Sequence, residues 1–358
     1  MTTLIIGGGL SGLALAERLE AAGQDYQLLE ARDRFGGRIL TEQVGGAPFD
    51  LGPAWFWPGQ PRMAALITRL GLRAFDQYAT GDLVYEDETG RLHRGRGFAS
   101  MQGSWRVEGG LSGLTEALAA RLPDTRKRLN AEVTRLERTG DTIRATLADG
   151  PMFEADRVVL AMPPRIVAGL EFAPALPERT MQTMAAVPTW MAGQAKAVAV
   201  YDTPFWREQG LSGDAMSRRG PMVEMHDASP AEGGPYAIFG FLGVPAAARA
   251  DEEALRRAIA AQLGRLFGDR AATPRALLLK DWAFDPLTAT RADAAPQGSH
   301  PSYGLPGALR GLWDGRLIFA GTEVAPTFGG FLEGALEAAE AALSQLSAPE
   351  RAPASAER

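Results

Sequence analysis

The first thirty residues contain a pattern that strongly limits how this chain can fold. Residues 3–6 (TLII) are typical of a short buried strand, and residues 13–19 carry the apolar stripe of a helix. Between them lies Gly7-x-Gly9-x-x-Gly12. In a dinucleotide-binding unit, the first glycine allows the tight turn, the second lets the backbone approach the pyrophosphate, and the third lets helix and strand pack closely. An ordinary glycine-rich turn lacks this context, so we predict such a unit here.

A second predicted strand, residues 26–29, ends in Glu30. A carboxylate at this point can accept hydrogen bonds from a ribose diol. The N-terminus of the preceding helix offers free N–H groups and a partial positive charge to phosphates. The pattern therefore predicts a bound dinucleotide, without indicating which one.

Composition excludes several classes of function. The chain has 358 residues, enough for two domains or one large one, and a net charge of −6. We therefore expect no nucleic-acid partner, and the basic run Arg126-Lys127-Arg128 is typical of a solvated turn. There are no cysteines, which excludes disulfides, thiolate metal sites and a cysteine-linked cofactor. We expect no metal.

No apolar run approaches the ~20 residues that span a bilayer. The first predicted strand starts at residue 2 or 3, so we expect no signal peptide. A cytoplasmic protein without membrane attachment is the resulting expectation. Residues 347–358, rich in alanine, proline and charge, are predicted to fray.

Further along the chain, segments with the strand and helix pattern of a nucleotide-binding domain alternate with segments of a different pattern. Ser112 is placed to cap a helix, and residues 153–160 form a single β-like run. After residue 164 new elements follow, including a strand over 194–201 and an amphipathic helix that ends near Phe267. Residues 316–320 then return to a strand–turn–helix pattern. This order predicts a discontinuous nucleotide-binding domain that is interrupted twice by a second, substrate-binding domain.

Several motifs, taken together, resemble the flavin-dependent amine oxidase family, which includes monoamine and polyamine oxidases. The resemblance covers nearly the whole chain, and together the motifs favour FAD over NAD. Its pieces occur in order: Gly7-x-Gly9-x-x-Gly12, Glu30, Gly36-Gly37-Arg38, Asp50-Leu51-Gly52-Pro53-Ala54-Trp55, Lys196 with Pro204-Phe205-Trp206-Arg207, Trp282, Ala320-Gly321-Thr322-Glu323, and Gly329-Gly330-Phe331-Leu332-Glu333-Gly334-Ala335.

The resemblance implies an α/β fold with a discontinuous, GR2-like Rossmann-type FAD-binding domain and an inserted α+β substrate domain. We expect the FAD-binding domain to comprise residues 1–60, 105–164 and 286–346, and the substrate domain to comprise residues 61–104 and 165–285, followed by the tail.

FAD is long, so residues from distant segments must hold it. Because there is no cysteine, we expect it to be bound non-covalently, although linkage through His93, His226 or His300 is conceivable. The motifs and the resemblance together predict these FAD contacts: Gly7, Gly9, Leu10, Ser11, Gly12, Glu30, Ala31, Arg32, Gly37, Arg38, Gly52, Pro53, Ala54, Trp55, Val133, Trp282, Gly321, Thr322, Glu323, Gly330 and Phe331.

Lys196 stands in a strand that is apolar on both faces. From the strand alone, two interpretations are equally good: a buried lysine with a lowered pKa, or an edge lysine that discourages aggregation. The spacing to Pro204-Phe205-Trp206-Arg207 favours the first. In the family that the chain resembles, a lysine here holds a water against flavin N5 and assists reoxidation by oxygen.

The resemblance implies oxidation of an amine C–N bond, with a small-molecule amine and O2 as partners. The expected catalytic set is Lys196, Phe331 and His300. Monoamine oxidases place two tyrosines before the flavin; Phe331 matches one position, and the other falls near His300, with Tyr303 as the alternative. Nothing in the sequence indicates an oligomeric state.

Other functions remain open at this point. The same fold hosts enzymes that desaturate C–C bonds or oxidise a dihydronicotinamide, and Lys196 argues against desaturation. A flavin-binding scaffold without turnover and an NAD-dependent dehydrogenase are further alternatives.

Overall fold

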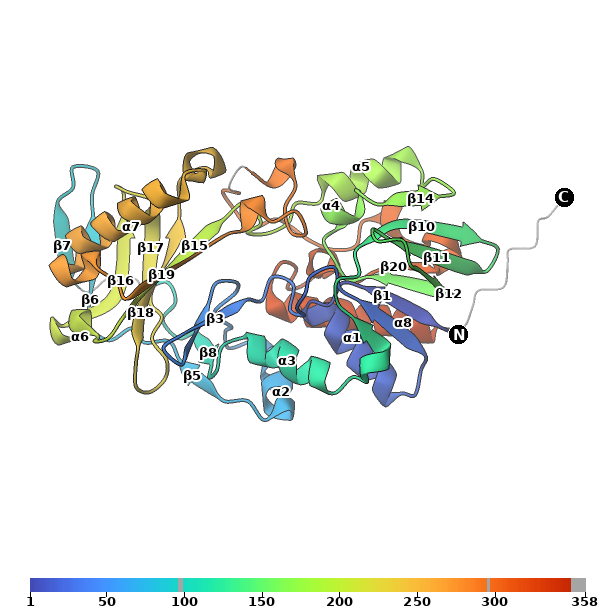
Figure 1. The fold of residues 1–358 in the computed structure, drawn as a ribbon, viewed down its shortest axis with the longest axis horizontal. Coiled ribbons are helices and arrows are strands. Elements are labelled where there is room, and N and C mark those ends of the chain that lie inside the picture. The colour runs from blue at the N-terminus through green and yellow to red at the C-terminus, as the bar shows by residue number, and fades with distance from the viewer. Residues whose placement is uncertain (96–98, 295–296, 349–358) are drawn as a thin grey trace.

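The computed structural model describes residues 1–95, 99–294 and 297–348, and it contains two lobes that lie side by side (Figure 1). One lobe is built on a five-stranded parallel sheet. In sheet order its strands are β20 (Leu317–Phe319), β13 (Arg157–Leu160), β1 (Thr3–Ile6), β2 (Tyr26–Leu29) and β9 (Lys127–Arg128). The two ends of the chain and its middle thus meet in one sheet.

The two faces of this sheet pack against different layers because successive side chains alternate. Ile5 belongs to a core shared with helices, whereas Leu4 and Ile6 belong to a core on the opposite face. The helices are α1 (Leu10–Ala21), α2 (Pro61–Leu70), α3 (Ser112–Ala120) and α8 (Leu332–Ser347). The opposite face carries β12 (Met152–Ala155), β11 (Thr142–Leu147), β10 (Val133–Thr139) and β14 (Glu171–Ala173), with α4 (Pro164–Val167) and α5 (Glu178–Ala186) nearby.

The structure corrects three local expectations. The single run over 153–160 is two strands, because the chain leaves β12 at Asp156 and enters the parallel sheet as β13. Ser112 does not cap its helix; its hydroxyl instead accepts the N–H of Thr41 at 3.1 Å. Helix α2, which we expected in the substrate domain, packs through Met63 into the core of the parallel-sheet lobe.

The second lobe is a seven-stranded sheet (Figure 1). Its strands, in sheet order, are β19 (Ala276–Asp281), β15 (Ala195–Tyr201), β18 (Tyr236–Leu242), β17 (Met222–Asp227), β16 (Leu211–Ser217), β6 (Asp82–Glu86) and β7 (Leu92–Gly95). Helix α7 (Glu252–Phe267) covers one face, where Ala197 and Ala199 pack. The opposite face, which includes Val198 and Phe239, packs against Trp55 and its neighbours.

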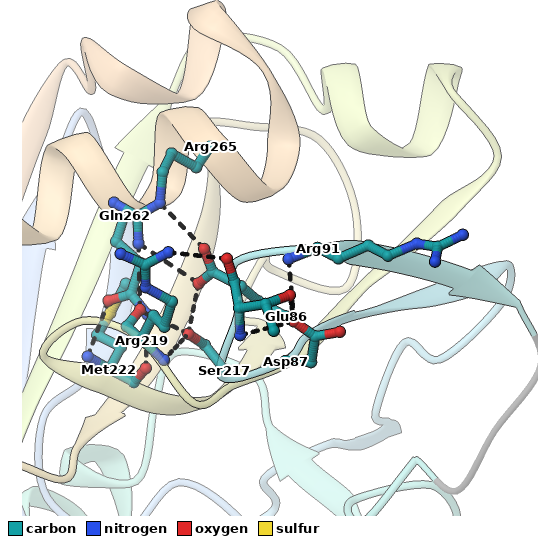
Figure 2. Close-up of polar contacts among 9 residues, drawn as sticks. Glu86, Asp87, Arg91, Ser217, Arg219, Met222, Gln262 and Arg265 are labelled. Carbon is teal, nitrogen blue, oxygen red and sulfur yellow. Dashed lines mark hydrogen bonds and ion pairs between the residues drawn. The ribbon is translucent and has the colours of Figure 1, made fainter.

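A buried polar cluster fastens α7 to this sheet (Figure 2). The Gln262 amide accepts the Met222 N–H at 2.9 Å and donates to the Met222 carbonyl at 2.7 Å. Nearby, Arg265 and the Ser217 hydroxyl both donate to Glu86. Because these polar groups are paired within the lobe and lie outside the main cavity, we interpret the cluster as structural.

Smaller elements complete the chain. They are the pairs β3 (Thr41–Val44) with β4 (Ala47–Asp50) and β5 (Ala74–Asp76) with β8 (Trp105–Val107), helix α6 (Phe205–Glu208), and 3-10 turns that include η4 (Trp282–Phe284) and η8 (Thr322–Val324). Within the described ranges, no helix has the length and apolar character needed to cross a membrane.

Candidate active site

A cavity of about 850 Å³ runs between the two lobes and receives residues from widely separated segments. Of the predicted site residues, the following line it: Gly7, Gly9, Leu10, Ser11, Glu30, Ala31, Arg32, Gly37, Arg38, Gly52, Pro53, Ala54, Trp55, Val133, Lys196, Trp282, Gly321, Thr322, Gly330 and Phe331. Gly12, Glu323 and His300 do not line it.

The glycine turn has the geometry that its spacing predicts. A Cβ at Gly12 would lie 2.0 Å from the carbonyl oxygen of Gly7, so only glycine lets α1 start this close to β1. Gly7 has a φ of +110° and faces the carbonyl of Ala161. Around Gly9, by contrast, the nearest atom to such a Cβ is 3.9 Å away, and the residue faces the cavity. Gly12 therefore acts through packing, while Gly9 leaves room for a bound group.

Glu30 braces the same turn from the end of β2. Its carboxylate is buried and accepts the N–H groups of Gly8 at 2.7 Å and Arg32 at 2.8 Å. These bonds hold the carboxylate at the cavity wall, and each of its oxygens keeps a lone pair for a further donor. A ribose hydroxyl is a donor of the right kind.

Arg38 and Glu323 face one another beside the cavity. Arg38 Nη2 lies 2.8 Å from Oε1 of Glu323, whose side chain is fully buried. The contact is an ion pair without hydrogen-bond alignment, and neither Glu323 oxygen accepts a hydrogen bond from a described residue. Buried carboxylate oxygens normally find donors, so Glu323 retains capacity for a donor such as a ribityl hydroxyl of FAD, while the Arg38 guanidinium can donate to the pyrophosphate. The residues present therefore fit the expected cofactor.

Lys196 is the buried cation of the cavity. Its ammonium donates to the carbonyl oxygen of Gly52 at 2.5 Å and lies 5.5 Å from the centre of the Phe241 ring. Burial lowers the pKa of Lys196 to about 8, and the nearby Asp50 carboxylate opposes this shift. Because β15 lies inside the sheet, between β19 and β18, the edge-lysine interpretation is wrong.

Trp282 closes the cavity beside Lys196. Its indole N–H donates to the carbonyl of Leu51 at 3.0 Å, and the Lys196 ammonium donates to the next carbonyl, that of Gly52. Trp282 and Lys196 therefore bind the same short segment, residues 51–52. The Lys280 ammonium lies 4.6 Å from the centre of the Trp282 ring. The ring is therefore fixed on several sides.

Phe331 and His300 form a stacked pair. Their ring centres lie 4.8 Å apart with an angle of 12° between the planes. At this distance the two rings touch, so they leave no slot between them for a substrate amine. Tyr303, the alternative second ring, sits edge-on to His300, and its hydroxyl donates to the carbonyl of Pro188. The structure thus brings the three predicted aromatic residues together in one cluster, in which Phe331 lines the cavity, whereas Tyr303 and the exposed His300 do not.

Sequence reasoning missed several cavity residues. Trp57, Trp190, Phe241 and Glu224 all line the cavity. Alternating polar residues in the segment Met222–Asp227, with Glu224 and His226 two apart, are the signal that could have placed a polar face on β17. Among the described residues that line the cavity there is no histidine, so no linkage of a cofactor to His93, His226 or His300 is supported.

Comparisons with known proteins agree with this geometry. The family model "Flavin containing amine oxidoreductase" matches residues 10–100 and 97–343. A putative flavin-containing monoamine oxidase of Mycobacterium tuberculosis is 27% identical, with 96% of each chain covered. A probable flavin-containing monoamine oxidase A of Dictyostelium discoideum is 24% identical, covering 93% of this chain and 94% of its own.

Solved structures share the fold. A putrescine oxidase bound to putrescine superposes with a TM-score of 0.82 at 22% identity, covering 97% of this chain and 99% of its own. Cyclohexylamine oxidase from Brevibacterium oxydans IH-35A gives a TM-score of 0.82 at 22% identity, covering 96% and 98%. Because the family model spans almost the whole chain and the dinucleotide motifs meet in one cavity, the chain belongs to the flavin-containing amine oxidoreductase family.

Proposed function

We propose that this enzyme oxidises the C–N bond of an amine and uses O2 as the electron acceptor. The observation that carries the proposal is the position of Lys196, a buried ammonium in the same cavity as the dinucleotide-binding turn. When bound, FAD would supply the redox chemistry, which is acceptance of a hydride from the carbon next to the amine nitrogen and transfer of the two electrons, with two protons, to O2 to give H2O2. The resulting imine hydrolyses to a carbonyl compound and an amine or ammonia.

The residues that would hold FAD follow the length of the cavity. Gly9 and α1 would bind the pyrophosphate, with Arg38 adding a charge-assisted donor. Glu30 would accept the adenosine ribose hydroxyls, and Val133 lines the cavity near that end. Without a cysteine in the chain, we propose that these contacts act without a covalent bond.

The substrate end of the cavity is mostly aromatic and apolar, with Trp57, Trp190 and Phe331 in its wall. Such a wall disfavours the charged form of an amine. This matters because only the neutral amine has a lone pair that supports the developing iminium. The protein therefore contributes desolvation and orientation, and no dedicated base is required.

Lys196 would act on the oxygen side of the reaction. Below its pKa of about 8 the ammonium is charged, and a fixed positive charge stabilises the superoxide that forms when oxygen takes its first electron. Gly52 and the strand register keep that charge in place.

The test is a panel of primary and secondary amines offered to the purified holoenzyme. We expect anaerobic bleaching of the yellow flavin absorbance by at least one amine and stoichiometric H2O2 in air. Lys196→Met should retain bleaching and react slowly with oxygen, whereas Lys127→Met, on β9 outside the cavity, should react like the wild type. Bleaching by a dihydronicotinamide or a C–C substrate, and by no amine, would overturn the proposal.

A further inference from the structure

A row of three cavity residues crosses the sheet of the second lobe. Lys196 on β15 pairs with Phe241 on β18, and Phe241 pairs with Glu224 on β17. Paired residues point to the same face of a sheet, and all three line the cavity. Since each pair brings two Cα atoms to about 5 Å, the backbone positions of Lys196 and Glu224 are about 10 Å apart. The cavity thus has a cation at one point and a carboxylate farther along the same wall.

The Glu224 carboxylate is held on one side and open on the other. Oε1 accepts a hydrogen bond from the Nε2–H of His226 at 3.0 Å and another from the hydroxyl of Ser100. No described residue bonds to Oε2, and 29% of the side chain is exposed. The hydrogen bond from His226 lowers the pKa of Glu224, so the group is an anion at neutral pH.

His226 is itself held by a second carboxylate behind it. Its Nδ1 lies 2.7 Å from Oδ1 of Asp214, and its ring packs edge-on against Trp55. Burial opposes protonation of His226, but the bonds to Asp214 and Glu224 raise its pKa overall. Even with His226 protonated, one cation faces two carboxylates, which leaves a net charge of −1 on the chain Asp214–His226–Glu224.

We infer that Glu224 binds a second cationic nitrogen of the substrate, at its open Oε2, and that the preferred substrates are therefore diamines or longer polyamines. This inference rests on the proposed function, because it describes the far end of the same substrate. An uncompensated carboxylate in an aromatic wall is costly unless a cation meets it. Phe241, between the two charges, offers a ring face along which an alkyl chain can lie.

The polar chain gives Glu224 one orientation. With Oε1 held by Ser100 and His226, rotation of the carboxylate is restricted, so Oε2 stays directed away from them. A preorganised acceptor loses little conformational entropy when a ligand binds. His226 and Asp214 do not line the main cavity, and we assign them the role of positioning the Glu224 carboxylate.

The experiment compares 1,4-diaminobutane, 4-amino-1-butanol and butylamine, which share one reactive end and differ at the other. We expect the wild-type holoenzyme to favour the diamine in kcat/KM by about 10- to 100-fold, as for a charge-assisted contact. Glu224→Gln, which keeps the shape and removes the charge, should abolish this preference and change kcat/KM for butylamine less than threefold. Glu232→Gln, an exposed glutamate of the same lobe, is the matched control and should behave like the wild type.

Binding is measured separately on the dithionite-reduced, anaerobic enzyme, which cannot turn over. There Glu224→Gln should weaken 1,4-diaminobutane about tenfold or more and leave butylamine unchanged. Glu224→Asp keeps the charge and shortens the side chain, so across diamines of three to eight carbons the optimum should move to a longer one. A purely structural Glu224 would lower stability without changing the discrimination.

Two results overturn the inference in distinguishable ways. If butylamine is oxidised as well as the diamine, or Glu224→Gln affects both alike, amine oxidation stands and the assignment of Glu224 is wrong. If no amine in the set or panel bleaches the flavin, the proposed function fails and this inference fails with it.

Discussion

The ammonium of Lys196 lies 2.5 Å from the carbonyl oxygen of Gly52, and this contact joins β15 of the second lobe to the loop after β4. The contact offers one backbone acceptor to a buried cation, whereas a fully satisfied ammonium makes three hydrogen bonds. A buried ammonium with unused donors lowers the stability of the fold, so we attribute its presence to the activity. Lys196 is thus where stability and activity are expected to diverge.

Replacement of Lys196 by methionine should stabilise the protein at neutral pH. The folded-state pKa of about 8 is below the usual 10.5, so the unfolded chain holds the proton more tightly, and this costs about 3 kcal/mol of stability below pH 8. The substitution removes this cost, but it also removes the hydrogen bond to Gly52, which lowers the stability by about 1 kcal/mol. We expect urea unfolding of Lys196→Met to show a net gain of about 2 kcal/mol at pH 7. The gain should shrink between pH 8 and 10.5, because there Lys196 is neutral in the folded wild-type protein and still charged in the unfolded chain. A loss of stability in Lys196→Met at pH 7 would contradict this account.

The two halves of the reaction should respond oppositely to pH. Reduction by the amine needs the neutral substrate, so its rate at limiting substrate rises toward the amine pKa of about 10.4. Reaction of the reduced enzyme with oxygen needs the Lys196 charge, so its rate constant should fall by roughly tenfold as pH rises through about 8. Stopped-flow measurement of each half separates them. In Lys196→Met the oxygen reaction should be slow and independent of pH; a profile like that of the wild type would exclude Lys196 as the group responsible.

The parallel-sheet lobe was predictable because its signals are local. The turn from Gly7 to Gly12 and the acid at Glu30 fall within one strand–helix–strand unit, and Gly12 packs as closely as its spacing implies. The cofactor contacts of Gly9 and Glu30 stay predictions. The run 153–160 was read as one strand because β12 and β13 are separated by a single residue, Asp156. Hydrophobic pattern alone does not reveal a change of sheet between two such strands.

The substrate end of the cavity depends on register between strands that are distant in sequence. Glu224 meets Lys196 only through Phe241, and His226 meets Asp214 across neighbouring strands. Moreover, β17 has an irregularity between Met222 and Glu224, which shifts the pairing by one residue. Such a shift moves side chains to the opposite face, so alternation could indicate a polar face without indicating its partners.

The pair Arg38–Glu323 should contribute to both stability and FAD binding. Arg38→Met leaves a fully buried carboxylate without its cation, which we expect to cost about 3 kcal/mol in unfolding free energy and to weaken FAD. Glu323→Gln removes the charge and should cost less. The double variant should be more stable than Arg38→Met alone, because the neutral amide no longer needs a cation. Urea unfolding and FAD titration by fluorescence measure the two effects; additive losses in the double variant would argue against direct coupling.

Gly12 should tolerate no side chain. In Gly12→Ala the new methyl carbon would lie 2.0 Å from the Gly7 carbonyl oxygen, a backbone atom that cannot move without displacing β1 from α1. We expect this variant to lose FAD and to unfold at a markedly lower temperature, as measured by flavin absorbance and circular dichroism. Gly307→Ala is the control, because its Cβ meets nothing within 4 Å and its φ lies outside the left-handed region. It should stay within about 0.5 kcal/mol of the wild type. A Gly12→Ala protein with normal FAD content would show that α1 can move away from β1, and the role of Gly12 in close packing would then be wrong.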